Sequence, residues 1–213
     1  MLKISAVIIA FNEEKYIEQC IRSLQEVADE IVVIDSLSTD KTPDICKALG
    51  VKFIQQPFLG YKEQKNFALS HASNDFILSL DADEQLSVEL KDEILSIKNS
   101  ETTKYAGYFF KRLNNYCGQW IYHTSYYPER KLRLFDRTKG SWGGLNPHDQ
   151  FILNKGYKSK CLKGNLLHWF IDTHDEHIQK INKFSTISAH SYFKAGKTSN
   201  YFKITFNPLY HFL

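Results

Sequence analysis

Asp81 and Asp83, separated only by Ala82, are the two side chains whose spacing most clearly predicts chemistry. They follow residues 75–80 (DFILSL), an apolar run typical of a buried strand. Two carboxylates at a strand end are hard oxygen ligands, the kind that Mg²⁺ and Mn²⁺ prefer. Because such a cation usually keeps substrate phosphate oxygens among its ligands, the motif predicts metal-assisted chemistry at a diphosphate.

Acidic residues also follow two other expected strands. Residues 4–10 (ISAVIIA) end just before Phe11 and Glu13, and residues 30–34 (EIVVI) end at Asp35. Any one of these acids alone could be a cap or turn residue. Ligands of open α/β sheets bind outside the carboxyl ends of the strands, so three acidic strand ends together predict a ligand site.

The elements that must position these residues follow from periodicity and turn chemistry. Four strand–helix alternations in the first part of the chain predict an α/β fold with a parallel sheet and helices on both faces. The expected strands are residues 4–10, 30–34, 51–55 and 75–80, and the expected helices cover residues 16–24, 42–49 and 63–72. Asn12 is expected to cap the first helix, Thr42-Pro43 to begin the second, and Gly50 to end it.

Past Ser87 the alternation stops. The pattern predicts a helix over 87–98, strands at 108–110 and 131–135, and a long helix over 175–194 that Gly196 ends. The stretch between them, 105–167, is rich in aromatic residues and glycine. We expect two parts that pack as one unit.

Composition excludes several classes of protein. The net charge is +3 and the basic residues are scattered among 24 acids, so the chain is not expected to bind nucleic acid. The apolar run 6–11 is far too short to cross a bilayer, and no charged leader with a cleavage site precedes it, which favours the cytoplasm. The four cysteines lie far apart without a CxxC pair and are expected to be free.

Four segments resemble the family 2 inverting glycosyltransferases, which have the GT-A fold. They are residues 4–24 (ISAVIIAFNEEKYIEQCIRSL), 29–42 (DEIVVIDSLSTDKT), 60–84 (GYKEQKNFALSHASNDFILSLDADE) and 126–144 (YYPERKLRLFDRTKGSWGG). Residues 131–135 (KLRLF), 166–170 (LLHWF) and 180–197 (KINKFSTISAHSYFKAGK) resemble the branch that builds the lipopolysaccharide core.

The resemblance implies a fold and a reaction. The expected fold is a Rossmann-like, mostly parallel sheet flanked by helices, in which residues 1–100 bind a nucleotide-sugar donor. Residues 101–213 would form a smaller acceptor-binding part. The expected reaction moves a sugar with inversion from a nucleoside diphosphate sugar, expected to be a UDP-sugar. The acceptor would be a hydroxyl of a cell-envelope glycan or a lipid-linked molecule.

The resemblance also implies roles for single residues. It assigns donor binding to Ala10, Phe11, Glu13, Asp35, Lys65, Asp81 and Ala82. Phe11 would offer a ring face to the base, and Asp35 would accept a hydrogen bond from a ring N–H, as suits uracil. Asp83 and His168 would hold Mg²⁺ or Mn²⁺. The alternative for His168 is a histidine satisfied inside the aromatic core.

The acceptor side is expected to include Trp142, Gly143, Gly144 and His148, although the glycines could equally be turn residues. The family branch places a carboxylate after a histidine shortly beyond its Trp-Gly-Gly, and Asp149 stands there as the expected general base. If Asp149 is only a turn residue, Asp136 and Asp172 are the next candidates. Leu37 replaces a glycine usual in the family's turn after the second strand.

Two other functions, and one surface contact, are alternatives that the sequence leaves open. A sugar nucleotidyltransferase would need a glycine-rich basic loop after the first strand, where residues 11–14 are acidic and glycine-free. A non-enzymatic receiver-like domain would be much shorter and would carry its acids after the first and third strands. The aromatic, weakly basic residues 201–213 favour either contact with the inner face of the cytoplasmic membrane or packing on the protein.

Overall fold

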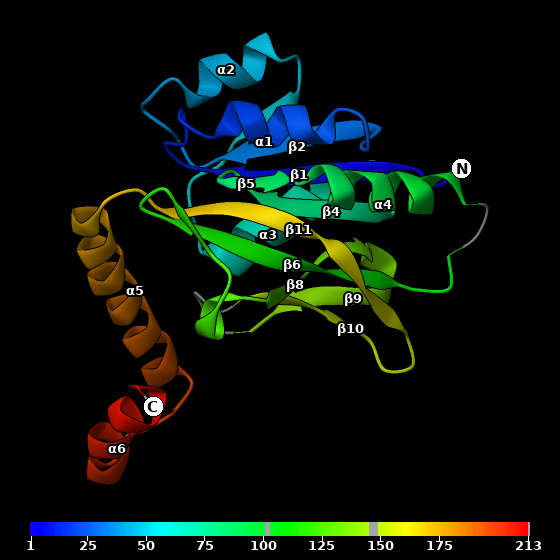
Figure 1. The fold of residues 1–213 in the computed structure, drawn as a ribbon. Coiled ribbons are helices and arrows are strands. Elements are labelled where there is room, and N and C mark those ends of the chain that lie inside the picture. The colour runs from blue at the N-terminus through cyan, green and yellow to red at the C-terminus, as the bar shows by residue number, and fades with distance from the viewer. Residues whose placement is uncertain (101–102, 145–148, 213) are drawn as a thin grey trace.

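A computed structural model describes residues 1–100, 103–144 and 149–212. Its centre is one sheet with helices against both faces (Figure 1). The expected α/β class, with a mostly parallel sheet flanked by helices, is confirmed.

The main sheet joins both parts of the chain. In sheet order its strands are β3 (Lys52–Gln55), β2 (Glu30–Asp35), β1 (Ile4–Ala10), β4 (Phe76–Asp81), β8 (Glu129–Asp136), β6 (Gly107–Tyr116), β11 (Ser159–Ile171) and β5 (Glu84–Leu86), with β7 (Gln119–Ile121) paired to β6. Strands β3, β2, β1 and β4 pair in parallel, and β8 runs antiparallel between β4 and β6. The second part therefore extends the first part's sheet.

Two apolar clusters hold the helices on this sheet. The first cluster lies between one face of the sheet and helices α1 (Ile17–Leu24), α2 (Thr42–Ala48) and α4 (Val88–Asn99). The second cluster lies on the opposite face, where it joins the sheet to α3 (Tyr61–His71) and to the hairpin of β9 (Gly140–Gly143) and β10 (Gln150–Leu153). Strand β1 is buried on both faces, because Ile8 belongs to the first cluster and Val7 to the second. Its sequence is therefore a continuous apolar run. Short 3₁₀ turns cover Thr124–Tyr126 and Arg137–Lys139.

Most of the expected strands and helices lie within a few residues of the observed ones, but β6 is much longer than the expected strand at 108–110, and β5, β7, β9, β10 and β11 were not predicted. Two helix caps were wrongly predicted. Helix α1 begins only at Ile17, and Asn12 does not cap it. Instead Asn12 has φ 54° and its Oδ1 accepts a hydrogen bond from the backbone N–H of Thr39 at 2.8 Å. Thr42 does not cap α2 either, because its hydroxyl accepts from the backbone N–H of Glu13 at 2.8 Å. Both side chains tie the loop after β1 to the loop after β2.

The chain continues past β11 into two helices that extend from the body of the protein (Figure 1). These are α5 (His174–Lys194), which has no buried residue, and α6 (Tyr201–Phe212). Among the described residues, no helix combines the length and apolar character needed to cross a membrane. The four cysteines are free, as expected.

Candidate functional site

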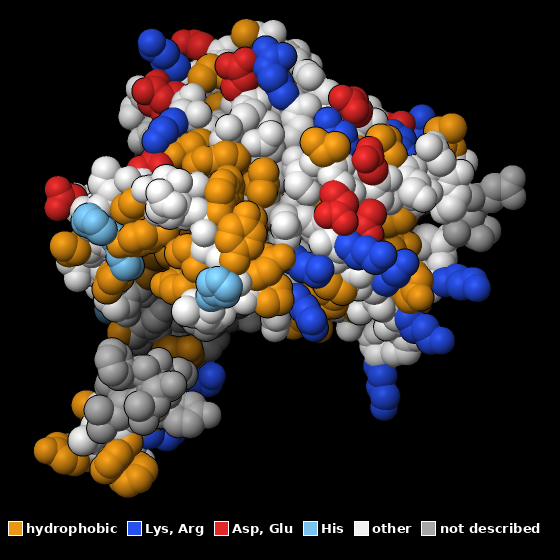
Figure 2. Space-filling model, in the orientation of Figure 1, with side chains coloured by type: hydrophobic (Ala, Val, Ile, Leu, Met, Phe, Trp, Pro, Cys, Tyr) orange, Lys and Arg blue, Asp and Glu red, His pale blue; other side chains and the backbone are white. Residues whose placement is uncertain are grey.

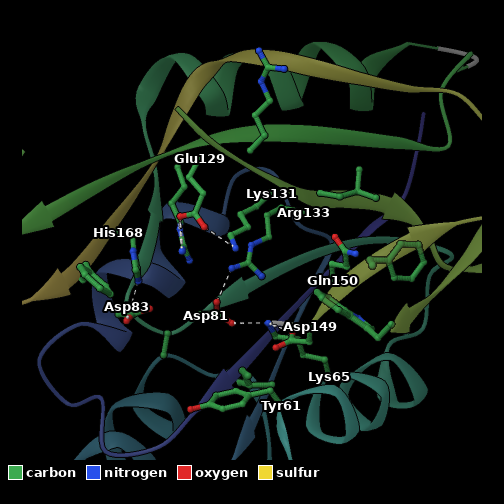
Figure 3. Close-up of a pocket in the computed structure, with 18 of the residues that line it drawn as sticks. Tyr61, Lys65, Asp81, Asp83, Glu129, Lys131, Arg133, Asp149, Gln150 and His168 are labelled. Atoms are coloured by element: carbon green, nitrogen blue, oxygen red, sulfur yellow. Dashed lines mark hydrogen bonds and ion pairs between the residues drawn. The ribbon is translucent and has the colours of Figure 1, made fainter. Parts of the chain in front are cut away.

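A cavity of about 1280 Å³ opens at the carboxyl ends of β1 and β4 (Figure 3). Its walls come from the ends of these strands, from α3, from β8, β10 and β11, and from α5. A site for one drug-sized ligand usually measures roughly 300–1,000 Å³. This cavity therefore has room for two substrates side by side.

The two aspartates of the Asp81-Ala82-Asp83 motif have different neighbours. Asp81 lies between two cations, with its Oδ2 2.6 Å from Arg133 Nη2 and its Oδ1 3.2 Å from Lys65 Nζ. Burial alone would raise the pKa of Asp81, but the charges of Arg133 and Lys65 outweigh it and hold the pKa well below the usual range. Asp81 is thus a fixed anion already balanced by the protein.

Asp83 instead faces His168, whose Nε2 lies 3.4 Å from Asp83 Oδ2. The other ring nitrogen, Nδ1, is 2.6 Å from Asn114 Oδ1, and the Asn114 amide donates to the carbonyl of Tyr126 at 3.0 Å. Since an amide oxygen only accepts, Nδ1 must carry the donated proton. In the neutral form of His168 the free lone pair would be on Nε2, the ring nitrogen that faces Asp83.

This pair fits a divalent cation. An imidazole nitrogen and a carboxylate are suitable ligands, and a partner that fixes the far ring nitrogen is typical of metal-binding histidines. Among the described residues, no group of three or more His, Cys, Asp or Glu side chains is arranged to hold a metal ion. A cation at Asp83 and His168 would therefore take its remaining ligands from substrate and water, as Mg²⁺ commonly does.

Glu13 adds a third carboxylate to the same side of the cavity. Burial raises the pKa of Glu13, the charge of Asp83 raises it further, and the resulting value is about 8. With that pKa the Glu13 carboxyl keeps its proton at pH 7, because the nearby cations do not balance a second anion beside Asp83. A cation bound here would favour the ionised form of Glu13.

Asp149 lies on the other side of the cavity, with Asp81 between it and Asp83 (Figure 3). Its Oδ2 is 2.9 Å from Lys65 Nζ, and the Lys65 ammonium also lies 4.7 Å from the centre of the Trp142 ring. The alternative bases are elsewhere. Asp136 caps the 3₁₀ turn after β8, and Asp172 binds Lys15 at 2.7 Å and the hydroxyl of Tyr16, so neither is among the described residues that line the cavity.

The residues expected to bind the donor fall into two groups. Ala10, Phe11, Glu13, Lys65, Asp81 and Ala82 all line the cavity, and the Phe11 ring is 53% exposed. Asp35 does not line it. This carboxylate is fully buried and accepts hydrogen bonds from Ser38 N at 2.9 Å and Gln55 Nε2 at 3.2 Å. In the same turn Leu37 has φ 64°, the geometry for which glycine is normally used.

Of the residues expected to shape the acceptor side, Trp142 lines the cavity. Gly143 belongs to β9 and pairs with Gln150, while Gly144 has φ 94°, and neither is among the described lining residues. A Cβ on Gly143 would come within 2.9 Å of Ile152 Cδ1, so this glycine allows close packing of the hairpin. His148 lies outside the described residues.

The structure also brings in charged residues that the sequence analysis did not single out. Glu129, Lys131 and Arg133 alternate along β8 and enter the cavity together (Figure 3). Arg112 on β6 joins them, with its Nη2 2.6 Å from Glu129 Oε2 and its Nη1 3.3 Å from Glu84 Oε1. The signal was present as charged residues at every second position of the strand, Glu-x-Lys-x-Arg, which places their side chains on one face of the sheet.

Comparisons with known proteins show which family this chain resembles. The family model described as "Glycosyl transferase family 2" matches residues 5–164. An uncharacterized glycosyltransferase of Rickettsia typhi is 35% identical over 221 residues, covering 100% of this chain and 76% of the relative. The "Lipopolysaccharide core biosynthesis glycosyltransferase LpsC" of Rhizobium meliloti is 34% identical over 217 residues, covering 100% of this chain and 80% of the relative.

A solved structure shows a more distant likeness. The structure of S. aureus TarS 1-349 in complex with UDP-GlcNAc is 27% identical with a TM-score of 0.43, covering 54% of this chain and 35% of that chain.

Proposed function

Because this chain belongs to glycosyl transferase family 2, we propose that it moves a sugar with inversion from a nucleoside diphosphate sugar to an acceptor hydroxyl. The chain is a glycosyltransferase. One observation carries the proposed mechanism. The Asp83–His168 pair and the Asp149 carboxylate line the same cavity, with Asp81, Lys65 and Arg133 between them (Figure 3).

The donor binds along the carboxyl ends of β1 and β4 in this proposal. The exposed Phe11 ring receives the base, and the diphosphate lies beside Asp83 and His168. A divalent cation held by these two residues would supply positive charge to the diphosphate as it leaves. Asp81, held by Arg133 and Lys65, keeps a fixed negative charge near the transferred sugar. The Phe11 ring can stack on any nucleobase, and we propose that the base is uracil.

Asp149 is the proposed general base. The acceptor oxygen forms its bond to the anomeric carbon while the bond from that carbon to the diphosphate oxygen breaks, and the hydroxyl proton passes to Asp149. Attack from the face opposite the leaving group inverts the anomeric centre. Lys65 holds Asp149 at the cavity wall, and its contact with Asp81 links the base to the donor side.

The acceptor is proposed to be a glycan or glycolipid of the cell envelope, bound by residues 101–213. Support comes from the lipopolysaccharide core enzyme of Rhizobium meliloti, whose relationship to this chain extends over the whole chain. The lining residues that come from β8, β9 and β10 all belong to this part of the chain.

Two measurements test the proposed function. Thermal unfolding with nucleoside diphosphates and Mn²⁺ should raise the unfolding midpoint, because a ligand that binds only the folded state stabilises it. Mass spectrometry of reactions that contain several nucleotide sugars and core-oligosaccharide or lipid-linked acceptors should reveal a product heavier by one sugar residue. Binding of nucleoside triphosphates with release of pyrophosphate would contradict the proposal and indicate a nucleotidyltransferase.

We also propose that α6 touches the inner face of the cytoplasmic membrane. Tyr201, Phe202 and Ile204 are exposed on this helix, where hydrophobic side chains lie at the surface (Figure 2). Lys197 precedes the helix, and Lys203 lies between Phe202 and Ile204. Such a composition suits the interface of an anionic bilayer. Co-sedimentation with anionic liposomes should be lost in a chain that ends at Gly196, and equal sedimentation of both chains would contradict this contact.

A further inference from the structure

Helix α5 presents one face to the cavity. Lys180, Lys183, Phe184 and Ser188 all line it, and their spacing places them on one side of the helix. The Phe184 ring lies 6.3 Å from the ring of Tyr61 on α3, which is also a lining residue. Since no residue of α5 is buried, this face is available to a ligand in the cavity.

The Lys180 ammonium is held in a defined place. It donates to the backbone carbonyl of Phe170 at 2.7 Å and lies 2.8 Å from Glu176 Oε1 one turn earlier on α5. It also sits 5.9 Å from the centre of the Phe170 ring. An ammonium carries three N–H donors. These two contacts leave one donor for a ligand.

Lys180 lies near the Asp83–His168 pair. The Phe170 carbonyl that accepts the hydrogen bond from Lys180 is two residues after His168 on β11, and the rings of Phe170 and His168 are 5.6 Å apart. Trp169, between these two residues, donates its backbone N–H to the Asp83 carbonyl at 3.0 Å. This geometry places the ammonium beside the part of the cavity where the proposed diphosphate binds.

Four other cations that line the cavity walls are paired with carboxylates of the sheet or of the hairpin β9–β10 and its loop. These are Lys65, Arg112, Lys131 and Arg133, whose partners are Asp81, Glu84, Glu129 and Asp149. Lys180 differs, because its ion partner Glu176 belongs to α5 itself and is not among the described lining residues. Its charge can therefore face a ligand.

We propose that Lys180 binds the diphosphate of the donor directly and stabilises it as it leaves. This inference rests on the proposed function and adds a residue to it. A hydrogen bond from an ammonium to a phosphate oxygen is charge-assisted and strengthens as negative charge grows on the leaving diphosphate. Helix α5 thereby contributes to the donor site from the far end of the sequence.

The test compares Lys180→Met with Lys194→Met, a matched control at the exposed end of the same helix. Calorimetry would first identify the nucleoside diphosphate that the unaltered protein binds. It would then measure the affinity of each protein for that diphosphate and for the matching nucleoside without phosphates. Both titrations are made in EDTA and again with Mn²⁺. The EDTA titration reports on Lys180 without a metal ion.

Lys180→Met is expected to weaken nucleoside diphosphate binding about 10- to 100-fold in both conditions, the range for one hydrogen bond to a charged group. Nucleoside binding should not change, Lys180→Arg should recover part of the loss, and Lys194→Met should match the unaltered protein. An equal loss for nucleoside and diphosphate would mean that Lys180 only anchors α5, and would overturn the inference. So would unchanged diphosphate affinity. If the unaltered protein binds no nucleoside diphosphate, the proposed function itself fails.

Discussion

The imidazole of His168 is joined to the Asn114 amide by a 2.6 Å hydrogen bond, which directs the other ring nitrogen at Asp83. Asn114 is itself oriented by the Tyr126 carbonyl, and only 2% of its surface is exposed. The proposed metal-binding pair thus depends on a residue that would not touch the metal.

Replacing Asn114 with alanine should therefore weaken Mn²⁺ binding. Loss of a partner that orients a metal-binding histidine typically costs 10- to 100-fold in metal affinity. Electron paramagnetic resonance, which detects the Mn²⁺ that stays free in solution, would measure the Mn²⁺ affinity of each variant. Asn115→Ala is the control, because Asn115 accepts a hydrogen bond from Gly118 N in a turn. Equal Mn²⁺ affinity in the two variants would mean that Asn114 does not orient the site.

Asp149→Asn should lower kcat by about 10²- to 10⁴-fold, the usual contribution of a general base. The amide keeps the shape of the side chain but cannot take the proton. Donor affinity should change little, because Asp149 lies away from Asp83 and His168 (Figure 3). Steady-state kinetics and donor titration check this, and turnover near that of the unaltered enzyme would exclude Asp149 as the base.

The ion pair of Lys65 and Asp149 should matter for stability. Their side chains are 7% and 5% exposed, so removing one partner leaves a charge in a poorly solvated place. Lys65→Met should lower the free energy of unfolding by about 3–5 kcal/mol in urea titrations. The double variant Lys65→Met/Asp149→Asn should regain part of that loss. Additive losses would show that the two side chains are not coupled.

Glu129 should make stability depend on pH in the acid range. Burial alone would raise the pKa of Glu129, but Arg112 and Lys131 outweigh it and lower the pKa to about 2. Because the folded-state pKa lies below the unfolded value of 4.5, the stabilisation is present above pH 4.5 and is lost as pH falls toward 2. The unfolding midpoint of Glu129→Gln should lie below that of the unaltered protein at pH 7, with a gap that narrows below pH 4.5.

A matched control for this pH series is Glu89→Gln, since Glu89 is exposed in the first turn of α4. It should show a small, nearly constant difference. A gap for Glu129→Gln that stays constant down to pH 3 would contradict the role of the Arg112 and Lys131 charges.

Leu37→Gly should stabilise the protein. Leu37 has φ 64° and is 48% exposed, so it carries the cost of a left-handed backbone and loses little burial when removed. That cost is about 1–2 kcal/mol, partly offset by the greater freedom of glycine in the unfolded chain. A net gain of up to about 1 kcal/mol is expected in urea titrations.

The reverse substitution at Gly50 provides the comparison. Gly50 has φ 68° and an added Cβ would meet nothing within 4 Å, so Gly50→Ala should be destabilised by the backbone cost alone, about 1 kcal/mol. If Leu37→Gly were also destabilised, the Leu37 side chain would have to make a contact that outweighs its backbone.

The sequence by itself determined the features that depend on neighbouring residues. The double-sided burial of Ile4–Ala10, the proline at the start of α2 and the Gly50 that ends it follow from local periodicity and backbone preferences, and all agree with the structure. The same local reasoning placed Asp81 and Asp83 at a strand end beside a cavity. Family resemblance added Asp149 and His168.

Only the tertiary structure decided how the side chains divide among partners. Asn12 and Thr42 were predicted as helix caps from their own segments. In the structure Asn12 bonds to the loop after β2, and Thr42 bonds to the loop after β1, and neither contact can be read from the local sequence. The division of Asp81 toward Arg133 and Asp83 toward His168 depends on where β8 and β11 lie relative to β4. Asn114 meets His168 because β6 and β11 pair in parallel at that register. Such contacts join residues many positions apart, and their geometry is fixed by strand order and packing, which local periodicity does not encode.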